Sequence, residues 1–516
     1  TGPTSQIYLQ SSATVQSGEP RLHNVTINSS GNTFNLGHHL TVEGNLTITA
    51  GTLDTDSSNN RALTVGEELT VAGGTLTCNS SAVTVRNVFQ STGTLTLPDA
   101  SGSFTVTGSG TAGSGNGYHI RLDGGTTTHS SGTVEITASA GTAILVKTNN
   151  INNLVLDSTG SGDTIQYIMD TQINGNLTLE DDMGLKSYNN GGDYYFLKVD
   201  GDVLISDGTL GRTEMDELYH FGSLTIASGA TFIATSGTTT IYGSSGGFAI
   251  LDEGTFTHNS GTVHIDYETS NLNSSTRIHQ NGAKKINNLE IEMNRTTDEV
   301  TFSVVSGTSQ GLAGDFTLTK GESMLYNNSH AFDVDGDFSV AANGTWGAVA
   351  HTGAHEFGSV TIASGGTFIA TSGTTTITGP YIGDHFLYQN AGTFTHNNGT
   401  VKLSYTSYAN LTSGGDAFYN LISDVNHGSH VGIQIYDALE VMNNLTINEN
   451  DALTCAMGTV TVHGNVYCYG NWSRYNTSSQ TQTIKGTLLI GSSGWYRPSS
   501  GTNNLGGIRN LGGSVN

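Results

Sequence analysis

The chain repeats itself on two length scales, and this repetition limits what it can fold into. Residues 221–243 read FGSLTIASGATFIATSGTTTIYG and residues 357–379 read FGSVTIASGGTFIATSGTTTITG, so 20 of 23 positions agree at an offset of 136. GTFTHNSGTV from Gly254 and GTFTHNNGTV from Gly392 form a second pair, and GTTTHSSGTV from Gly125 is a weaker copy. Repetition of this kind is typical of stacked, quasi-one-dimensional architectures.

Larger blocks are marked by an Asn that precedes an apolar residue. The steps between these anchors are 129, 135, 132 and 90, and the anchors are Asn24-Val25, Asn153-Leu154, Asn288-Leu289, Asn420-Leu421 and Asn510-Leu511. We therefore expect an extended N-terminal segment at 1–20, then solenoid blocks at 21–150, 151–285 and 286–417, and a shorter block at 418–516.

A finer repeat shows what is stacked. Phrases of the form Gly-[Asn/Asp]-apolar-Thr-apolar recur, and related phrases at Gly314, Gly336 and Gly358 lie 22 residues apart. They alternate apolar and polar residues, as a strand with one buried face does. Gly, Asn, Asp and Ser fill the gaps, where turns need them. This period suits one coil of a β-solenoid, because stacked coils share a core and pair each other's backbone groups.

We therefore predict an all-β fold, a parallel β-solenoid with coils of about 22 residues. The apolar residues of the phrases should point inward, among them Leu177, Leu179, Val203, Ile205, Phe316, Leu318, Phe338, Val340, Val360 and Ile362. An array of antiparallel β-sandwiches is the alternative, and it predicts turns every 8–12 residues. The hairpin-like dipeptides Asp200-Gly201 and Asp335-Gly336 favour that alternative.

Charge and hydropathy narrow the range of partners. The chain has 43 acidic and 18 basic residues, a net charge of −25 and no strongly basic cluster. Nucleic acid is therefore not an expected partner, because phosphate binding needs clustered Lys and Arg. No stretch approaches the 18 apolar residues of a membrane-spanning helix, so we expect no membrane insertion. Thr1 stands where an initiator Met would be, which suggests processing or a cut from a longer protein.

Three cysteines do not make a disulfide framework. Cys455 and Cys468 lie 13 residues apart on neighbouring strand phrases. A bridge between them and buried single thiols both stay open as interpretations. Sequons such as Asn45-Leu-Thr permit glycosylation without indicating it, since a chain rich in Asn and Thr forms them by chance.

One candidate metal site stands out. Asp333, Asp335 and Asp337 resemble the start of a calcium loop, so calcium is the one cofactor we consider, although the Glu that completes an EF-hand is missing. Turn chemistry also explains the motif, because other phrases carry other polar residues in that slot. His129, His258 and His396 occupy equivalent repeat positions, and we attribute them to the repeat, so no transition-metal site is expected.

Candidate catalytic residues are sparse, and we assign none. Glycosidases need two carboxylates across a cleft, and acidic pairs occur at Asp181-Asp182 and Asp252-Glu253. The most irregular stretch is 211–220 (GRTEMDELYH), which is either a catalytic excursion or a turn. Several tyrosines are candidates either for sugar stacking or for ladders between coils: Tyr194, Tyr195, Tyr242, Tyr267, Tyr405 and Tyr408.

The phrases GTFTHNNGTV, FYNL, GNLTI and ASGGTFIATSGTTTI resemble those of low-complexity β-helix repeat proteins. Such proteins occur on the surfaces of bacteria and archaea and in virions of marine and environmental phages. The resemblance covers residues 21–511 and is one of repeat texture. It implies the fold of a right-handed parallel β-helix, a superfamily that contains adhesins, phage spikes and polysaccharide lyases. This chain lacks a recognisable lyase motif.

We expect a structural protein outside the cell, on a cell surface or on a virion, that forms a fibre, a filament subunit or an adhesin. Its action would be multivalent, with one repeated face presented many times. The alternatives are a carbohydrate-active spike that cleaves polysaccharide and a secreted carbohydrate-binding module. Surface glycans are therefore candidate partners.

We also expect self-assembly. The end of a solenoid exposes unpaired backbone groups, and no amphipathic helix near either terminus caps them. Ile508, Asn510 and Leu511 read as the opening phrase of another block. This predicts head-to-tail stacking of copies into a homopolymer.

Overall fold

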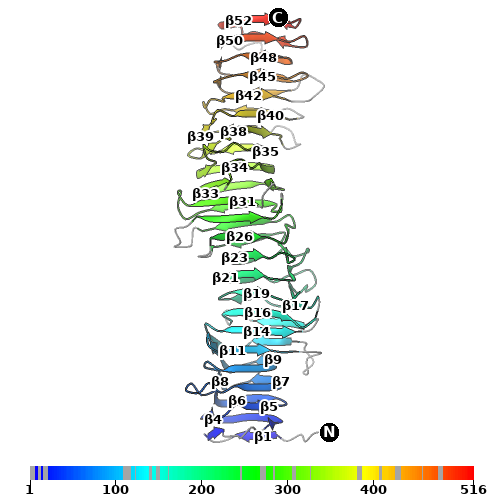
Figure 1. The fold of residues 1–516 in the computed structure, drawn as a ribbon, viewed down its shortest axis with the longest axis vertical. Helices are drawn as coiled ribbons and strands as arrows, with labels where there is room; N and C mark the ends of the chain where they lie inside the picture. The colour runs from blue at the N-terminus through cyan, green and yellow to red at the C-terminus, as the bar shows by residue number, and fades with distance from the viewer. Residues whose placement is uncertain are drawn as a thin grey trace. The chain divides into compact units, whose positions relative to one another are not determined.

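The computed structural model describes residues 6–9, 13–15, 21–108, 118–122, 124–138, 142–146, 151–160, 162–243, 247–267, 275–282, 285–304, 309–325, 327–379, 386–405, 409–424, 432–455, 457–474 and 480–515. The chain divides into two compact units, 1–261 and 262–516. The regular elements of the described residues are all strands (Figure 1). None of the described segments forms a helix that is long and apolar enough to cross a membrane.

The strands of unit 1 form coils with three faces. In its first coils the chain runs through β4 (Asn24–Leu36), β6 (Leu46–Asp54), β7 (Leu63–Val71) and β9 (Ala82–Gln90), with shorter strands between them. Face A stacks Val25, Leu46, Leu69 and Val88 in parallel register. Face B stacks Phe34, Leu53, Leu76 and Leu95. Face C stacks Leu40, Leu63, Val83 and Phe104.

Unit 2 has the same construction. Its phrases pair in parallel at steps of 22, as Phe316 on Phe338 and Phe338 on Val360 show. These residues lie in β33 (Phe316–Leu325), β34 (Phe332–Trp346) and β35 (His355–Ile362). The prediction of parallel coils is confirmed, and the ten apolar residues expected to point inward are all buried. The sandwich alternative is wrong, since antiparallel contacts in the described residues are limited to isolated bridges such as Asn190 to Asp193.

A ladder of side chains explains the Asn or Asp of the repeated phrase. In unit 1, Asn153 Oδ1 accepts the backbone N–H of Asn176 at 2.9 Å, and Asn176 Oδ1 accepts that of Asp202 at 2.9 Å. Asp202 Oδ1 then accepts the hydroxyl of Ser223 at 2.7 Å. Each coil is thereby bonded to the next at the position where its strand begins, which leaves this backbone N–H satisfied.

Unit 2 repeats this ladder with carboxylates. Asn288 Oδ1 accepts the N–H of Asp315 at 2.9 Å, Asp315 Oδ1 accepts that of Asp337 at 2.8 Å, and Asp337 Oδ1 accepts the hydroxyl of Ser359 at 2.6 Å. Each large block thus opens a ladder with its anchor Asn. The Asn is selected because its amide oxygen reaches the next coil.

The Gly before each ladder residue makes room for the side chain of the preceding coil. A Cβ on Gly201 would collide with Asn176 Oδ1, and one on Gly336 would collide with Asp315 Oδ1. The dipeptides Asp200-Gly201 and Asp335-Gly336, which resemble hairpin turns in sequence, are therefore parts of long parallel strands. Close approach between coils, rather than a hairpin, requires these glycines.

The block repeat changes face within unit 1. The stack of Val25 (face A) continues through Ile120 to the strands β15 (Thr142–Val146), β17 (Thr164–Tyr167) and β20 (Gly184–Ser187). Leu154, the block-2 equivalent of Val25, instead stacks on Val134 and Phe104, on face C. A block therefore does not contain a whole number of coils, and equivalent residues of blocks 1 and 2 lie on different faces.

The anchor at Asn510 also needs correction. In the last coils Leu421 stacks on Leu445, Val466, Leu488 and Ile508 in turn, which puts Gly507 in the ladder position. Asn510 Oδ1 instead accepts the N–H of Gly512 at 3.0 Å, as Asn390 does for Gly392 at 2.9 Å. Asn510 therefore closes a turn at the end of a strand and does not open another block.

The cysteines are buried thiols. No disulfide joins Cys455 to Cys468, so the bridge interpretation is wrong. Cys468 Sγ donates to the carbonyl of Gly470 at 3.4 Å, and burial raises the pKa of its thiol to about 12. These thiols act as small apolar side chains of the core.

Candidate functional site

The irregular stretch 211–220 forms an excursion between β22 (Thr209–Gly211) and β23 (Tyr219–Ile226). Gly211 has φ +105°, and a Cβ there would collide with the carbonyl of Ile233, so the chain turns here because it carries Gly. Met215 is fully buried and anchors the excursion in the core. Its carbonyl accepts Thr235 Oγ1 at 3.1 Å and the backbone N–H of Ser236 at 2.8 Å.

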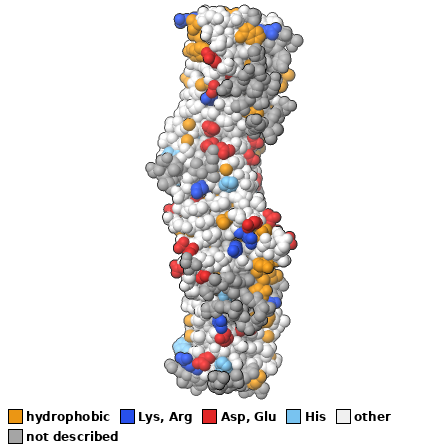
Figure 2. Space-filling view, turned by 90° about the vertical axis from the view of Figure 1, so that its right-hand side faces the viewer, with side chains coloured by type: hydrophobic (Ala, Val, Ile, Leu, Met, Phe, Trp, Pro, Cys, Tyr) orange, Lys and Arg blue, Asp and Glu red, His pale blue; other side chains and the backbone are white. Residues whose placement is uncertain are grey.

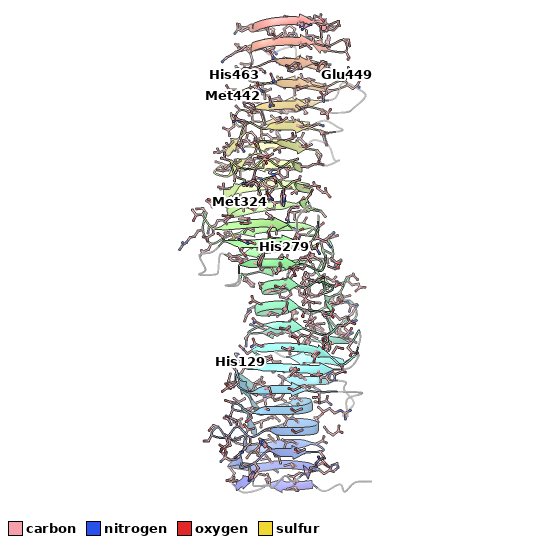
Figure 3. All side chains as sticks on the ribbon, viewed as in Figure 1. His129, His279, Met324, Met442, Glu449 and His463 are labelled. Atoms are coloured by element: carbon pink, nitrogen blue, oxygen red, sulfur yellow. The ribbon has the colours of Figure 1, made fainter. Side chains whose placement is uncertain are left out.

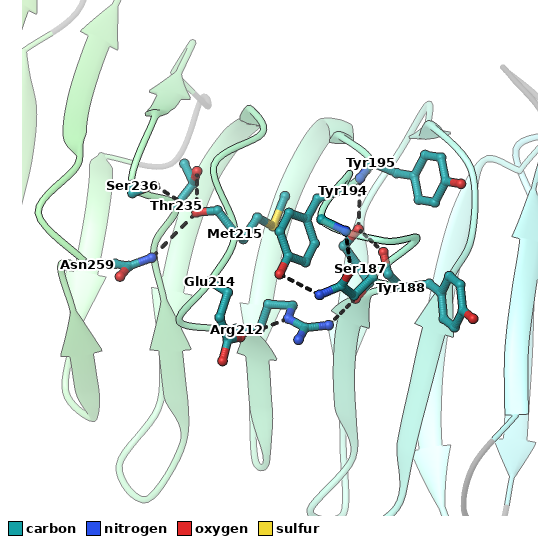
Figure 4. A network of polar contacts seen from close by, with 12 residues as sticks. Ser187, Tyr188, Tyr194, Tyr195, Arg212, Glu214, Met215, Thr235, Ser236 and Asn259 are labelled. Atoms are coloured by element: carbon teal, nitrogen blue, oxygen red, sulfur yellow. Dashed lines mark hydrogen bonds and ion pairs between the residues drawn. The ribbon is translucent and has the colours of Figure 1, made fainter.

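Arg212 is fixed from three sides. Its Nε donates to Glu214 Oε2 at 3.1 Å, its Nη1 donates to the carbonyl of Ser187 at 3.2 Å, and its guanidinium lies 5.0 Å from the centre of the Tyr194 ring (Figure 4). The Arg212 side chain is 22 % exposed and that of Glu214 is 61 % exposed. The hydrogen bond from Arg212 lowers the pKa of Glu214, so this carboxylate is ionised at neutral pH.

A surface groove lies against this excursion, with a volume of about 380 Å³. Its walls come from β17, β20, β22, the excursion and β24 (Thr231–Ile233), all within unit 1. The lining residues are Thr164, Gly184, Leu185, Lys186, Thr209, Gly211, Arg212, Thr213, Glu214 and Ile233. The groove therefore combines three threonine hydroxyls, two cations and one carboxylate with a small apolar floor.

An exposed aromatic side chain extends from the strand that carries this groove. Tyr188 follows Ser187, whose carbonyl binds Arg212, and its ring is 44 % exposed. Figure 4 shows the rings of Tyr188 and Tyr195 on the same side of the network, both directed away from it. An exposed aromatic ring beside polar groups is a platform on which a sugar ring can stack.

The groove has the chemistry of a binding site. Glu214 is the one acid among its lining residues, and Arg212 holds it in the ionised form. Hydrolysis of a glycosidic bond uses two carboxyl groups on opposite sides of that bond. The lining residues therefore provide hydrogen-bond donors and positive charge for recognition, without a carboxyl pair.

The structure does not bring the calcium candidates together. Asp333, Asp335 and Asp337 follow one another along β34, and the Asp337 carboxylate bonds to Ser359 in the ladder. Alternate residues of a strand lie about 6.6 Å apart, so the three carboxylates form a row. Among the described residues, no three His, Cys, Asp or Glu side chains are grouped closely enough to hold a metal ion.

The repeated histidines take part in turns and contacts between coils. His258 Nδ1 accepts the N–H of Ser260 at 3.0 Å, and His396 Nδ1 accepts that of Asn398 at 3.0 Å. His129 Nε2 lies 2.8 Å from Asn174 Nδ2 (Figure 3). The turn bond is thus common to His258 and His396, whereas the contact given for His129 is to another coil.

Three of the six candidate tyrosines belong to the core. Tyr194, Tyr267 and Tyr405 are buried, which favours packing over sugar binding. Tyr195 is half-buried, and Tyr242 Oη forms a 2.5 Å hydrogen bond with His220 Nδ1. Tyr408 lies outside the described residues.

The acidic pairs are also accounted for locally. Asp182 Oδ2 accepts the N–H of Gly162 at 2.8 Å, and Asp252 Oδ1 accepts that of Gly254 at 3.1 Å. Sequence reasoning missed Asp157, whose carboxyl pKa is raised by burial and then by the charge of Asp181 on the next coil. Only the stacking register reveals this pair.

The residues expected to mediate assembly lie on the outermost described coil of unit 2. Ile508 in β52 (Asn503–Asn510) is 53 % exposed, and Leu511 is 49 % exposed. Strand β52 pairs with β50 (Gln482–Ile490) on one side.

Sequence reasoning also missed Lys186, which reads as an ordinary outward residue of a strand. Its place beside Arg212 depends on how β20 and β22 stack.

No protein-family model, curated protein or solved structure matches the chain. Its fold is that of a β-solenoid repeat protein, with parallel coils of about 22 residues.

Proposed function

We propose that the protein is a structural solenoid that works outside the cell, on a cell surface or on a virion, as a fibre or filament subunit. The observation that carries this proposal is the ladder of side chains. It joins runs of successive coils in both units, in addition to the backbone pairing. Such bonds contribute about 1 kcal/mol each, and they favour a scaffold that resists local opening.

Surface composition supports the same role. Charged residues are 12 % of the chain, and the face in Figure 2 is mostly uncharged, with basic and acidic side chains in small groups. A surface with so few charges loses little stability to screening by salt. That property suits a protein exposed to environments of changing ionic strength.

Head-to-tail assembly is part of the proposal. In this proposal a strand of a second copy pairs with β52 on the side opposite β50, and the exposed Ile508 and Leu511 add apolar contact. An added strand on such an edge gains main-chain hydrogen bonds. A heterologous contact of this kind does not close on itself and so builds a filament.

Electron microscopy and light scattering of the purified chain test this assembly. We expect particles whose length grows with protein concentration, and shorter particles after deletion of 503–516. A monodisperse monomer at all concentrations contradicts head-to-tail stacking. Polymers of unchanged length after the deletion place the contact elsewhere.

A second role is favoured by the groove of unit 1. We propose that this surface holds a glycan, which would make the scaffold adhesive. The threonine hydroxyls that line the groove support this role, and the exposed ring of Tyr188 lies next to Ser187 in the chain. Incubation with glycans separates adhesion from cleavage, because an adhesive protein retains the glycan and an enzyme releases new reducing ends.

A further inference from the structure

The internal repeat provides a natural control for the groove. At the offset of 136, the excursion 211–220 corresponds to 347–356 in unit 2. The anchoring bonds are the same, because Thr371 Oγ1 donates to the carbonyl of His351 at 3.2 Å and the N–H of Ser372 does so at 2.8 Å. Gly347 also keeps a positive φ, of +90°. The path of the backbone therefore does not depend on the side chains that line the groove.

The charged groups of the groove are missing from the second copy. Arg212 and Glu214 correspond to Ala348 and Ala350, and Lys186 corresponds to Met324 by strand register. The exposed Thr213 corresponds to Val349, which is 69 % exposed. Since the excursion forms without these charges in unit 2, their presence in unit 1 requires another explanation.

The two cations are arranged to receive an anion. Three contacts hold the Arg212 guanidinium in one orientation, so little side-chain entropy is lost when it binds a ligand. Lys186 is half-buried and makes no hydrogen bond or ion pair with the described residues. Two of the 18 basic residues of a chain with net charge −25 thus line one groove, where a lone ammonium gains from an added negative charge.

We infer that this groove binds an acidic polysaccharide, with Lys186 and Arg212 on its carboxylate or sulfate group and the groove's threonine hydroxyls on the sugar hydroxyls. The inference rests on the glycan-binding role proposed above and names the ligand class. Guanidinium groups bind carboxylate and sulfate through paired hydrogen bonds. A volume of about 380 Å³ is at the lower end for ligand pockets, which suits a short stretch of a longer glycan.

Calorimetric titration with matched oligosaccharides tests the inference. One set has neutral hexoses, one has the corresponding uronic acids, and one has sulfated hexoses of the same linkage. We expect binding of one or both acidic sets and at least tenfold weaker binding of the neutral set, which is about 1.4 kcal/mol. The uronate and sulfate sets distinguish the two sources of negative charge.

The variants replace groove residues of unit 1 with their counterparts in unit 2. Lys186→Met and Arg212→Ala introduce the residues found at Met324 and Ala348, and we expect the double variant to lose at least tenfold in affinity. Arg212→Lys should recover part of the affinity, because it restores the positive charge without the paired hydrogen-bond donors of a guanidinium. Lys198→Met removes a lysine of unit 1 that pairs with Asp200 at 2.9 Å, and it should leave affinity within twofold.

Each contrary result has a definite meaning. Equal affinity for neutral and acidic sets, or an unaffected double variant, overturns the assignment of an acidic ligand and leaves the adhesive role standing. An equal loss in Lys198→Met shows that net charge, not the groove, attracts the ligand. Binding of no glycan at all overturns the adhesive role as well. Circular dichroism and thermal midpoints of each variant separate these results from loss of fold.

Discussion

Residues 211–220 in unit 1 and residues 347–356 in unit 2 are two versions of one excursion, and they differ in what they place inside and outside. Outside, unit 1 has Arg212 and Glu214 where unit 2 has alanines. Inside, unit 1 buries Met215 and Tyr219, whereas unit 2 buries His351 and His355. The hydrogen bonds that hold the two excursions are the same, one from a threonine hydroxyl and one from a serine N–H in each unit. A repeat scaffold therefore tolerates different side chains on its outer surface and in its interior, provided that its turns and anchoring hydrogen bonds are kept.

The buried side chains of the two excursions differ in how they respond to pH. Tyr219 packs on Phe221 and Phe232 in unit 1, with ring centroids 5.4 and 5.7 Å apart. In unit 2, the imidazole of His355 lies 5.8 Å from that of His351, and neither of its nitrogens has a hydrogen-bond partner in the described residues. Burial, and then the neighbouring His351, lowers the pKa of His355 to about 3.

The largest expected effect concerns the glycines that precede the ladder residues in both units. Gly201→Ala in unit 1 and Gly336→Ala in unit 2 each put a methyl group against the ladder side chain and the backbone of the preceding coil. We expect each to lower the free energy of unfolding by about 2–3 kcal/mol, as overpacking does. Chemical denaturation of the full chain measures this.

Gly507→Ala is the matched control for these glycines. A Cβ there meets only Thr487 Oγ1 at 3.6 Å, an ordinary contact. We expect a change of no more than about 0.5 kcal/mol, as for most surface substitutions. Equal destabilisation by all three variants would mean that the glycines matter for chain flexibility and not for close approach.

The next effect distinguishes the two units by the pH dependence of their stability. Because the folded-state pKa of His355 lies below its unfolded value near 6.5, the stability that depends on the neutral ring is complete above pH 6.5. It falls as the pH drops toward the folded pKa, by about 1.4 kcal/mol for each pH unit. Amide hydrogen exchange at pH 7 and pH 5, corrected for intrinsic rates, should show weakened protection at 332–357.

A double variant checks the cause of this acid sensitivity. His351→Met with His355→Tyr imports the interior of unit 1, and we expect it to remove the loss of protection at pH 5. Segment 63–71 of the same protein, which contains no histidine, serves as the internal reference. Equal loss of protection in the variant would assign the acid sensitivity to groups other than the two imidazoles.

A smaller effect concerns the anchoring hydroxyls. Thr235→Val removes one of the hydrogen bonds to the carbonyl of Met215, and Thr371→Val removes the bonds to the carbonyls of His351 and Gly353, the latter 2.7 Å long. We expect a loss of about 1 kcal/mol for the first and somewhat more for the second. Urea unfolding resolves the difference, and an inert Thr371→Val would show that the excursion is held by its backbone bonds alone.

The smallest effect on stability belongs to the outside of the groove. Arg212→Ala removes a partly exposed ion pair and a cation–π contact, so we expect the free energy of unfolding to fall by less than about 1 kcal/mol. Ala348→Arg with Ala350→Glu should change the stability of unit 2 equally little. A loss above about 2 kcal/mol in Arg212→Ala would give the arginine a structural role and weaken the argument for binding.

Much of this architecture can be predicted from the sequence, because the signals are local. Apolar alternation and the 22-residue step predict parallel coils, and the predicted core positions such as Leu177 and Phe338 are buried as expected. The irregularity of 211–220 correctly marks the place where a side chain network replaces the regular coil. Local patterns suffice here because each coil contacts only its two neighbours.

Other features depend on how the coils stack. Lys186 and Arg212 are 26 residues apart, and only the pairing of β20 with β22 brings them to one groove. The change of face between Val25 and Leu154, and the turn role of Asn510, follow from the register of many strands in succession. A difference of a few residues in coil length does not show in a short sequence motif. Such differences add up along the solenoid and determine which side chains lie next to each other.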